Sequence, residues 1–133
     1  MITFRLESRS GVPAYLQLMQ QVKHALRLGI LREGDQLPTV KEVTKMIVIN
    51  PNTVSKAYRE LENEGLVRGR IGSGTFVLAR PSGPSPEVQT QLAEEVAAWI
   101  VRARAADLDD EAIITLVRSV LHNEKEGLSD GNE

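Results

Sequence analysis

Short polar and long cationic side chains follow one another in the stretch NPNTVSKAYRELENEGLV, positions 50 to 67. Asn52, Thr53 and Ser55 carry small hydrogen-bonding groups, and Lys56 and Arg59 come next. Amides and hydroxyls at the start of a helix can hydrogen-bond base edges or phosphates, while Lys and Arg can reach the phosphate backbone. A helix N-terminus adds partial positive charge and unpaired N–H groups. This combination is typical of DNA recognition.

The same stretch contains the signals that would place these groups on a helix. Asn50 can cap the first turn, and Pro51 suits the first helical position because its missing N–H costs nothing there. Gly65 can end the helix in the left-handed conformation. The face opposite the polar groups has an apolar stripe at helical spacing, which we expect to be buried: Val54, Ala57, Tyr58 and Leu61.

Two more helices are predicted upstream. Residues 13–31 have apolar side chains at helical spacing, and Gly29 ends the run. After a turn at 32–38, Thr39 and Glu42 form a capping-box pattern that opens a short helix ending near Ile47. Residues 48–50 leave only a tight turn before the next helix. Two helices so joined predict a helix-turn-helix, whose second helix can enter the DNA major groove.

A glycine-punctuated hairpin is predicted directly after these helices. Residues 66–68 and 75–77 are strand-like, and GRIGSG connects them. The tip presents Arg68 and Arg70 beside Gly72 and Gly74, where backbone N–H groups can approach a phosphate closely. A hairpin in this position is a wing, so residues 1–78 are predicted to form a winged helix-turn-helix domain.

The composition changes at residues 79–87, ARPSGPSPE, which predict an extended linker. Residues 88–126 then predict two amphipathic helices, and 127–133 a disordered tail. Two helices alone enclose little core, so we expect them to pair with the same helices of a second chain. The expected dimer-interface residues are Val88, Leu92, Val96, Trp99, Ile100, Ile113, Val117, Val120 and Leu121.

Bulk composition excludes several classes of function. The 133 residues include no Cys, and the two histidines lie nearly a hundred positions apart, so we expect no metal site and no cofactor. No spacing supports a catalytic triad or a P-loop, so we expect no enzyme. The N-terminus has no secretory pattern and no apolar run is long enough for a membrane span, which favours a cytoplasmic protein.

The net charge of −2 hides an asymmetry along the chain. Residues 1–80 hold twelve Lys and Arg against seven Asp and Glu, whereas residues 81–133 hold four against eleven. A basic first part and an acidic second part can separate an anion-binding surface from a partner-binding one.

Residues 13–78 also resemble a known family. The strings GILREGDQLPTVKEVTKM and NPNTVSKAYRELENEGLV, followed by the glycine-rich wing, are similar to the winged helix-turn-helix of GntR-type bacterial transcription regulators. The NPNTV string and the short two-helix tail point to the YtrA-like subfamily. The resemblance implies a homodimeric repressor that binds an inverted-repeat operator, usually near its own operon and often one encoding an ABC transporter. On DNA, such a protein would be associated with the nucleoid.

The resemblance also assigns roles to individual residues. Lys41 stands where the family commonly has an arginine, and it lacks the planar fork for bidentate contacts, so a phosphate contact is expected there. Gly72, Ser73 and Gly74 form the wing tip. The predicted DNA-binding residues are thus Lys41, Asn50, Asn52, Thr53, Ser55, Lys56, Arg59, Arg68, Arg70, Gly72, Ser73 and Gly74.

Val48 occupies a turn position that is usually glycine in this family. A β-branched residue would be strained there if the position needed a positive φ. We expect an adjusted turn, and a Val48→Gly substitution that is neutral or stabilising.

The sequence therefore predicts a mainly α fold with a small β-hairpin: an N-terminal winged helix-turn-helix and a C-terminal two-helix dimerisation segment. Two alternatives to a DNA-binding repressor stay open. The winged helix could be a protein-interaction module, or the chain could sense a small molecule at the dimer interface. The DNA-binding interpretation fits the short polar side chains better, because protein interfaces favour aromatic anchors.

Overall fold

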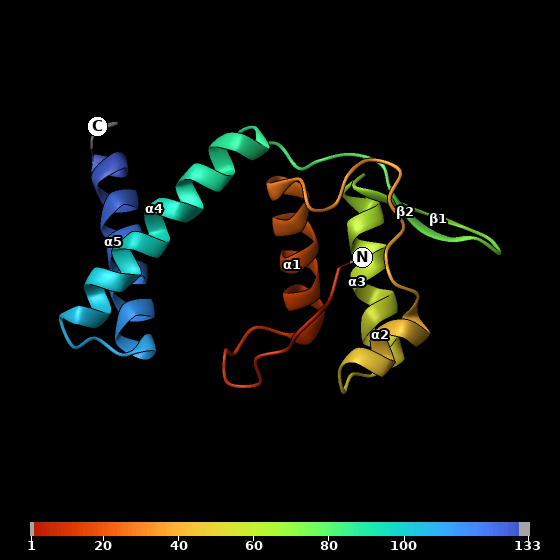
Figure 1. The fold of residues 1–133 in the computed structure, drawn as a ribbon, viewed down its shortest axis with the longest axis horizontal. Helices are drawn as coiled ribbons and strands as arrows, with labels where there is room; N and C mark the ends of the chain where they lie inside the picture. Colours follow the sequence, from red (N-terminus) through yellow and green to blue (C-terminus); the bar gives the residue numbers. More distant parts are fainter. Residues whose placement is uncertain (1, 131–133) are drawn as a thin grey trace. The chain divides into compact units, whose positions relative to one another are not determined.

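Three helices, a hairpin and two further helices follow one another in the computed structural model (Figure 1). The structure describes residues 2–130, with side chains placed for residues 2–127. The elements are α1 (Ala14–Leu28), α2 (Val40–Met46), α3 (Pro51–Asn63), β1 (Val67–Arg70), β2 (Gly74–Val77), α4 (Pro86–Ala105) and α5 (Asp110–Asp130). This order confirms the predicted fold class. The chain divides into two compact units between Thr90 and Gln91.

The first unit is built around α1 and α3, which stand side by side with α2 at one end of α3 (Figure 1). The predicted apolar stripes of both helices are buried in its core, together with Ile2 and Phe4 from the N-terminal segment. Burial of such side chains contributes about 1.5–3 kcal/mol each to folding. The core therefore fixes the relative placement of the helices that carry the polar face.

The N-terminal segment is held on α1 by two glutamines one helical turn apart. The Gln21 amide donates to the Arg5 carbonyl at 2.7 Å and accepts from the Arg5 N–H at 3.0 Å. The Gln17 amide pairs in the same way with the backbone of Glu7, at 2.8 and 3.0 Å. Each side chain thereby satisfies both backbone groups of an extended residue, as a neighbouring strand would.

The wing is an antiparallel pair, β1 with β2, in which Val67 lies opposite Val77 and Arg70 opposite Gly74 (Figure 1). Val67 and Val77 are buried, whereas Arg68 and Arg70 alternate with them on the exposed face. The connection between α1 and α2 borders the free edge of β2: Leu37 N–H donates to the Thr75 carbonyl and Val77 N–H to the Asp35 carbonyl, both at 2.8 Å.

The predicted linker, residues 79–87, ends two residues earlier than expected. Helix α4 begins at Pro86, a first-turn position that proline favours. Arg80 donates to the carbonyls of Leu26 and Arg27 at the end of α1, and also to that of Pro84. These bonds satisfy carbonyls left free at a helix C-terminus, and they hold residues 80–84 against α1.

In the second unit, α4 and α5 are joined by a short turn. Ala103 on α4 and Ile113 on α5 are buried, and Arg104 pairs with Asp110 at 3.0 Å across the turn. The prediction of a disordered tail over residues 127–133 is wrong for residues 127–130, because α5 continues to Asp130. Its last turns contain the i,i+4 pair His122–Glu126, at 3.0 Å, which favours helix. Residues 131–133 lie outside the described residues.

None of the helices within residues 2–130 has the length and apolar character needed to cross a membrane.

Candidate DNA-binding surface

The N-terminus of α3 is capped as predicted. Asn50 has extended backbone angles, and its side-chain oxygen accepts from the Asn52 N–H at 2.8 Å. Pro51 follows as the first helical residue. Because the Asn50 oxygen is used in the cap, its exposed amide nitrogen is the group that can donate to a base edge or a phosphate.

The exposed face of α3 presents Asn52, Ser55 and Arg59 at i, i+3 and i+7, which places them in one row along the helix. Asn52 and Arg59 are exposed, and Ser55 is half-buried. Thr53 is also half-buried and lies to one side of this row. At 1.5 Å per residue the row extends about 10 Å, a length that suits a helix lying in a groove.

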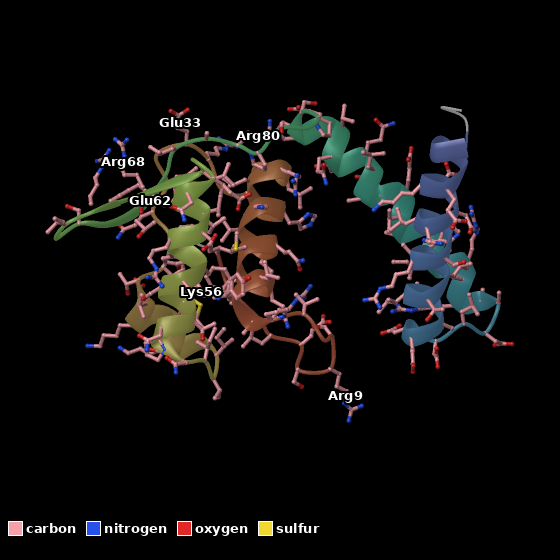
Figure 2. The ribbon with its side chains drawn as sticks, turned by 180° about the vertical axis from the view of Figure 1, so that it is seen from behind. Arg9, Glu33, Lys56, Glu62, Arg68 and Arg80 are labelled. Atoms are coloured by element: carbon pink, nitrogen blue, oxygen red, sulfur yellow. The ribbon has the colours of Figure 1, made fainter. Side chains whose placement is uncertain are left out.

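Lys56 lies beside this row, on the side toward α1. Its ammonium is 4.1 Å from the centroid of the Tyr15 ring, so the side chain turns toward α1 (Figure 2). A cation over an aromatic face is held by the ring quadrupole. Lys56 thus joins the edge of the polar face next to α1 rather than the central row.

Helix α2 begins with the predicted capping box. Thr39 Oγ1 accepts from the Glu42 N–H, and the Glu42 carboxylate accepts from the Thr39 N–H, both at 3.1 Å. This fixes the first turn of α2, which carries the exposed Lys41. A lone exposed ammonium in this position suits a phosphate contact.

The turn between α2 and α3 leaves Val48 fully exposed, and among the described residues other than glycine only Asp107 has a positive φ. Val48 therefore carries no left-handed strain. A Val48→Gly substitution has no strain to relieve, which reverses the sign expected from the sequence: added freedom in the unfolded chain should destabilise the variant.

The wing tip turns through Gly72, whose φ is +78°, and Ser73 N–H closes the turn on the Arg70 carbonyl at 3.0 Å. A positive φ at the third position of a turn favours glycine. The Arg70 guanidinium lies 5.0 Å from the Phe76 ring, and Arg68 is exposed on the same strand (Figure 2). Both arginines can reach a phosphate from the wing.

Tyr58 belongs to the core and not to the polar face. It is buried, and its hydroxyl donates to the Pro38 carbonyl at 2.6 Å. Burial raises the pKa of the Tyr58 hydroxyl well above its usual value, and the Glu42 carboxylate adds to the increase. The bond ties α3 to the residues that lead into α2, and so it fixes the helix-turn-helix geometry.

Three residues that sequence reasoning did not single out border this surface. Ile71 is fully exposed at the wing tip, Tyr15 holds Lys56, and Gln36 donates to the Ser73 carbonyl at 3.1 Å. The hairpin pattern already placed Ile71 at the tip. The contacts of Tyr15 and Gln36 join segments about forty residues apart, and no local pattern signals them.

The residues expected at a dimer interface fall into three groups. Six are between 42% and 58% exposed within the chain: Val88, Leu92, Val96, Val117, Val120 and Leu121. Trp99 and Ile100 are half-buried. Ile113 is buried by its own chain, so it supports the packing of α4 and α5 and offers little surface to a partner.

A helix-turn-helix followed by a wing, with short polar groups at the start of the second helix, defines the winged-helix class of DNA-binding proteins. Residues 14–77 match the family model of bacterial regulatory proteins of the gntR family. The chain is 35% identical over 124 residues to the HTH-type transcriptional repressor YtrA of Bacillus subtilis, covering 92% of this chain and 95% of that protein. The chain belongs to the GntR family of transcription regulators and is YtrA-like, as the sequence motifs predicted.

Solved structures agree with this placement. YtrA of Sulfolobus acidocaldarius, a GntR-family transcription factor, is similar with a TM-score of 0.54 and 25% identity, covering 90% of this chain and 97% of that one. A transcriptional antiterminator of Listeria monocytogenes has a TM-score of 0.57 and 29% identity, with 90% of each chain covered. The gntR family and the repressor YtrA are transcription regulators, which confirms the prediction that this chain is no enzyme.

Proposed function

We propose that the chain is a homodimeric repressor that binds an inverted-repeat operator in the cytoplasm, at the promoter of its own operon, and that this operon encodes an ABC transporter. The observation that carries the proposal is the polar face of α3. It starts at a capped helix N-terminus, continues through Asn52, Ser55 and Arg59, and is joined by exposed arginines on the wing. The relative YtrA of Bacillus subtilis is itself named a transcriptional repressor, which supports that part of the proposal.

Sorting the proposed contacts by chemistry separates readout from positioning. Asn52 and Ser55, near the start of α3, suit base edges, because an amide or hydroxyl can both donate and accept. Lys41, Arg59, Arg68 and Arg70 suit phosphates, and these contacts would set the register of α3 on the duplex. Lys56, held by Tyr15, would contact the backbone at the edge of the same groove.

The second unit supports dimerisation. Apart from Val101, its exposed Val and Leu side chains occupy one side of each helix, and an apolar surface of this kind is stable when a second copy covers it. A two-fold dimer would present two α3 helices in opposite senses, which matches an inverted repeat with half-sites about 34 Å apart.

The test is a fluorescence-anisotropy titration of the chain against the DNA upstream of its own gene, beside a scrambled duplex of equal length, at several salt concentrations. Specific binding should favour the upstream DNA by at least about a thousandfold. With about ten phosphate contacts per dimer, five from each chain, the affinity should fall with salt at a log–log slope of about −9. Equal affinity for both duplexes would contradict a sequence-specific regulator and favour the protein-interaction alternative.

Charge-reversal variants test the surface itself. Arg59→Glu and Arg70→Glu should each lower operator affinity by about tenfold or more and make the salt slope about two units shallower, because each dimer loses two phosphate contacts. Arg118→Glu, which makes the same charge change on α5, is the matched control and should bind as the unsubstituted chain does. Unchanged affinity in both α3 and wing variants would place the DNA contacts elsewhere.

A further inference from the structure

The connection between α1 and α2 acts as a third strand beside the wing. Gly34 N–H donates to the Val77 carbonyl at 2.9 Å, and two more backbone bonds join Asp35 and Leu37 to β2. Gln36 is paired with Phe76 as an isolated bridge in this ladder. These bonds fix the base of the hairpin, where β2 leaves the core, but the backbone ladder does not extend as far as the tip.

The side chain of Gln36 continues the ladder to the tip. Its amide nitrogen donates to the carbonyl of Ser73 at 3.1 Å, beyond the last backbone pair of the hairpin, Arg70 with Gly74. It also packs on Gly74, where a Cβ would overlap the Gln36 amide nitrogen. Gly74 has a φ of +121°, which L side chains rarely adopt. One side chain from the α1–α2 connection thus occupies the space that the absent Cβ leaves open.

A two-stranded ribbon needs such a support. Paired strands alone are marginally stable in water and twist easily. The tip residues 71–73 are exposed and extend from the first unit (Figure 1). A backbone N–H contributes to phosphate binding only when it is held within hydrogen-bond distance, so a mobile tip would lose contacts that a fixed tip makes.

We propose that Gln36 is a positioning residue for DNA binding, which holds the wing tip at a fixed distance from α2 and α3 through its bond to Ser73 and its packing on Gly74. Gln36 leads through Leu37 and Pro38 to the capping box of α2, and the Pro38 carbonyl is bonded to Tyr58 of α3. The wing tip and the helix-turn-helix are therefore tied to the same short segment. The proposal rests on the proposed function in one respect, that the wing contacts DNA.

The first measurement uses the protein without DNA. In Gln36→Ala and in Gln36→Met, which keeps the volume but removes the donor, backbone ¹⁵N relaxation of Gly72 and Ser73 should show larger amplitudes than in the unsubstituted chain. The thermal midpoint should change little, because Gln36 is exposed. Gln20→Ala, an exposed glutamine on α1, is the matched control. A tip equally rigid in all four proteins would overturn the proposal.

The second measurement uses operator DNA. Both Gln36 variants should bind about three- to tenfold more weakly than the unsubstituted chain, as expected for the loss of one hydrogen bond. A double-mutant cycle with Gly74→Ala separates positioning from direct contact. The φ strain at residue 74 is common to both backgrounds, whereas the overlap with the Gln36 amide is not. Gly74→Ala should therefore cost less affinity when Gln36 is already Ala, and strict additivity would overturn the proposal.

The two measurements distinguish a failure of the positioning role of Gln36 from a failure of the proposed function. If the unsubstituted chain did not bind operator DNA, the proposed function would fail, and the relaxation experiment would still decide whether Gln36 orders the tip. If the unsubstituted chain bound DNA and both Gln36 variants bound equally well, the positioning role would fail and the proposed function would stand.

Discussion

At the scale of single residues, one buried hydroxyl fixes the geometry on which the DNA-binding surface depends. Tyr58 lies on the apolar side of α3, and its bond to the Pro38 carbonyl is the buried polar contact between α3 and the segment before α2. A buried carbonyl without a partner costs about 1–3 kcal/mol. Tyr58 therefore contributes both packing and orientation.

Tyr58→Phe should lower the free energy of unfolding by about 1 kcal/mol, because the ring is kept and the Pro38 carbonyl loses its donor. Urea denaturation measures this value. Tyr15→Phe is the matched control: it keeps the ring under Lys56, and it should change the stability by less than about 0.5 kcal/mol. A larger loss at Tyr15 than at Tyr58 would contradict the assignment.

The same substitution should alter the pH dependence of stability. A tyrosine in the unfolded chain ionises near pH 10, whereas burial raises the pKa of Tyr58 in the folded protein. The unfolded state therefore loses the proton first, and stability that is present below about pH 10 is lost as the pH rises further. Between pH 9 and 11, Tyr58→Phe should lose less stability than the unsubstituted chain does.

At the scale of elements, helix ends decide where the chain turns. After α1, Ile30 N–H donates to the Ala25 carbonyl around Gly29, and after α3, Leu66 N–H donates to the Leu61 carbonyl around Gly65. Both are Schellman ends with a left-handed glycine. Helix α4 ends with the same bonds, but Asp107 takes the glycine position with a φ of 68°.

Asp107→Gly should raise the free energy of unfolding by about 1 kcal/mol, because the left-handed conformation costs a residue with a Cβ roughly 1–2 kcal/mol. Val48→Gly is the matched comparison and should change stability in the opposite direction. Val48 has no positive φ, so its substitution should lower stability by about 0.4–1 kcal/mol through the entropy of the unfolded chain. Thermal denaturation of the two variants should move the midpoint in opposite directions, and a shift of the same sign would refute the backbone explanation.

At the scale of the whole molecule, charge and apolar surface are divided between the two units. The basic residues predominate before residue 81 and the acidic ones after it. The second unit leaves valines and leucines exposed on α4 and α5. A helical hairpin by itself buries little of this apolar surface. This division separates the proposed DNA contacts from the proposed dimer contacts.

Val96→Glu combined with Val120→Glu should convert the dimer to a monomer at micromolar concentration, because pairing would bury four carboxylates per dimer without partners. Both side chains are exposed within the chain, so the hairpin itself should stay folded. Light scattering measures the mass, and operator affinity should fall with it, since a monomer contacts one half-site.

Val101→Glu is the control for this experiment. Val101 is 68% exposed and lies on the side of α4 away from Val88, Leu92 and Val96. The Val101→Glu variant should therefore stay dimeric. A double variant that is still dimeric would place the interface outside the α4–α5 stripe.

The local features of this protein could be predicted from its sequence because each depends on neighbours in the chain. The cap at Asn50, the box of Thr39 with Glu42, the glycine ends at Gly29 and Gly65, and the apolar stripes of α1 and α3 are all present. The last turn of α5, residues 127–130, was missed, because its glycine and polar residues suit a tail as well as a helix end.

Contacts between distant segments were decided only by the tertiary structure. Three contacts join residues that lie 37 to 54 positions apart in the sequence: Gln36 with Ser73, Lys56 with Tyr15, and Arg80 with Leu26 at the end of α1. Hydrogen-bond and aromatic partners of this kind leave no periodic pattern, because any exposed polar side chain could have pointed into solvent instead. The sequence by itself determined which helix carries the polar face and where α2 and α3 begin, since capping and helical periodicity act within a few residues. The tertiary structure alone decided that Gln36 contacts the wing tip and that Lys56 contacts Tyr15.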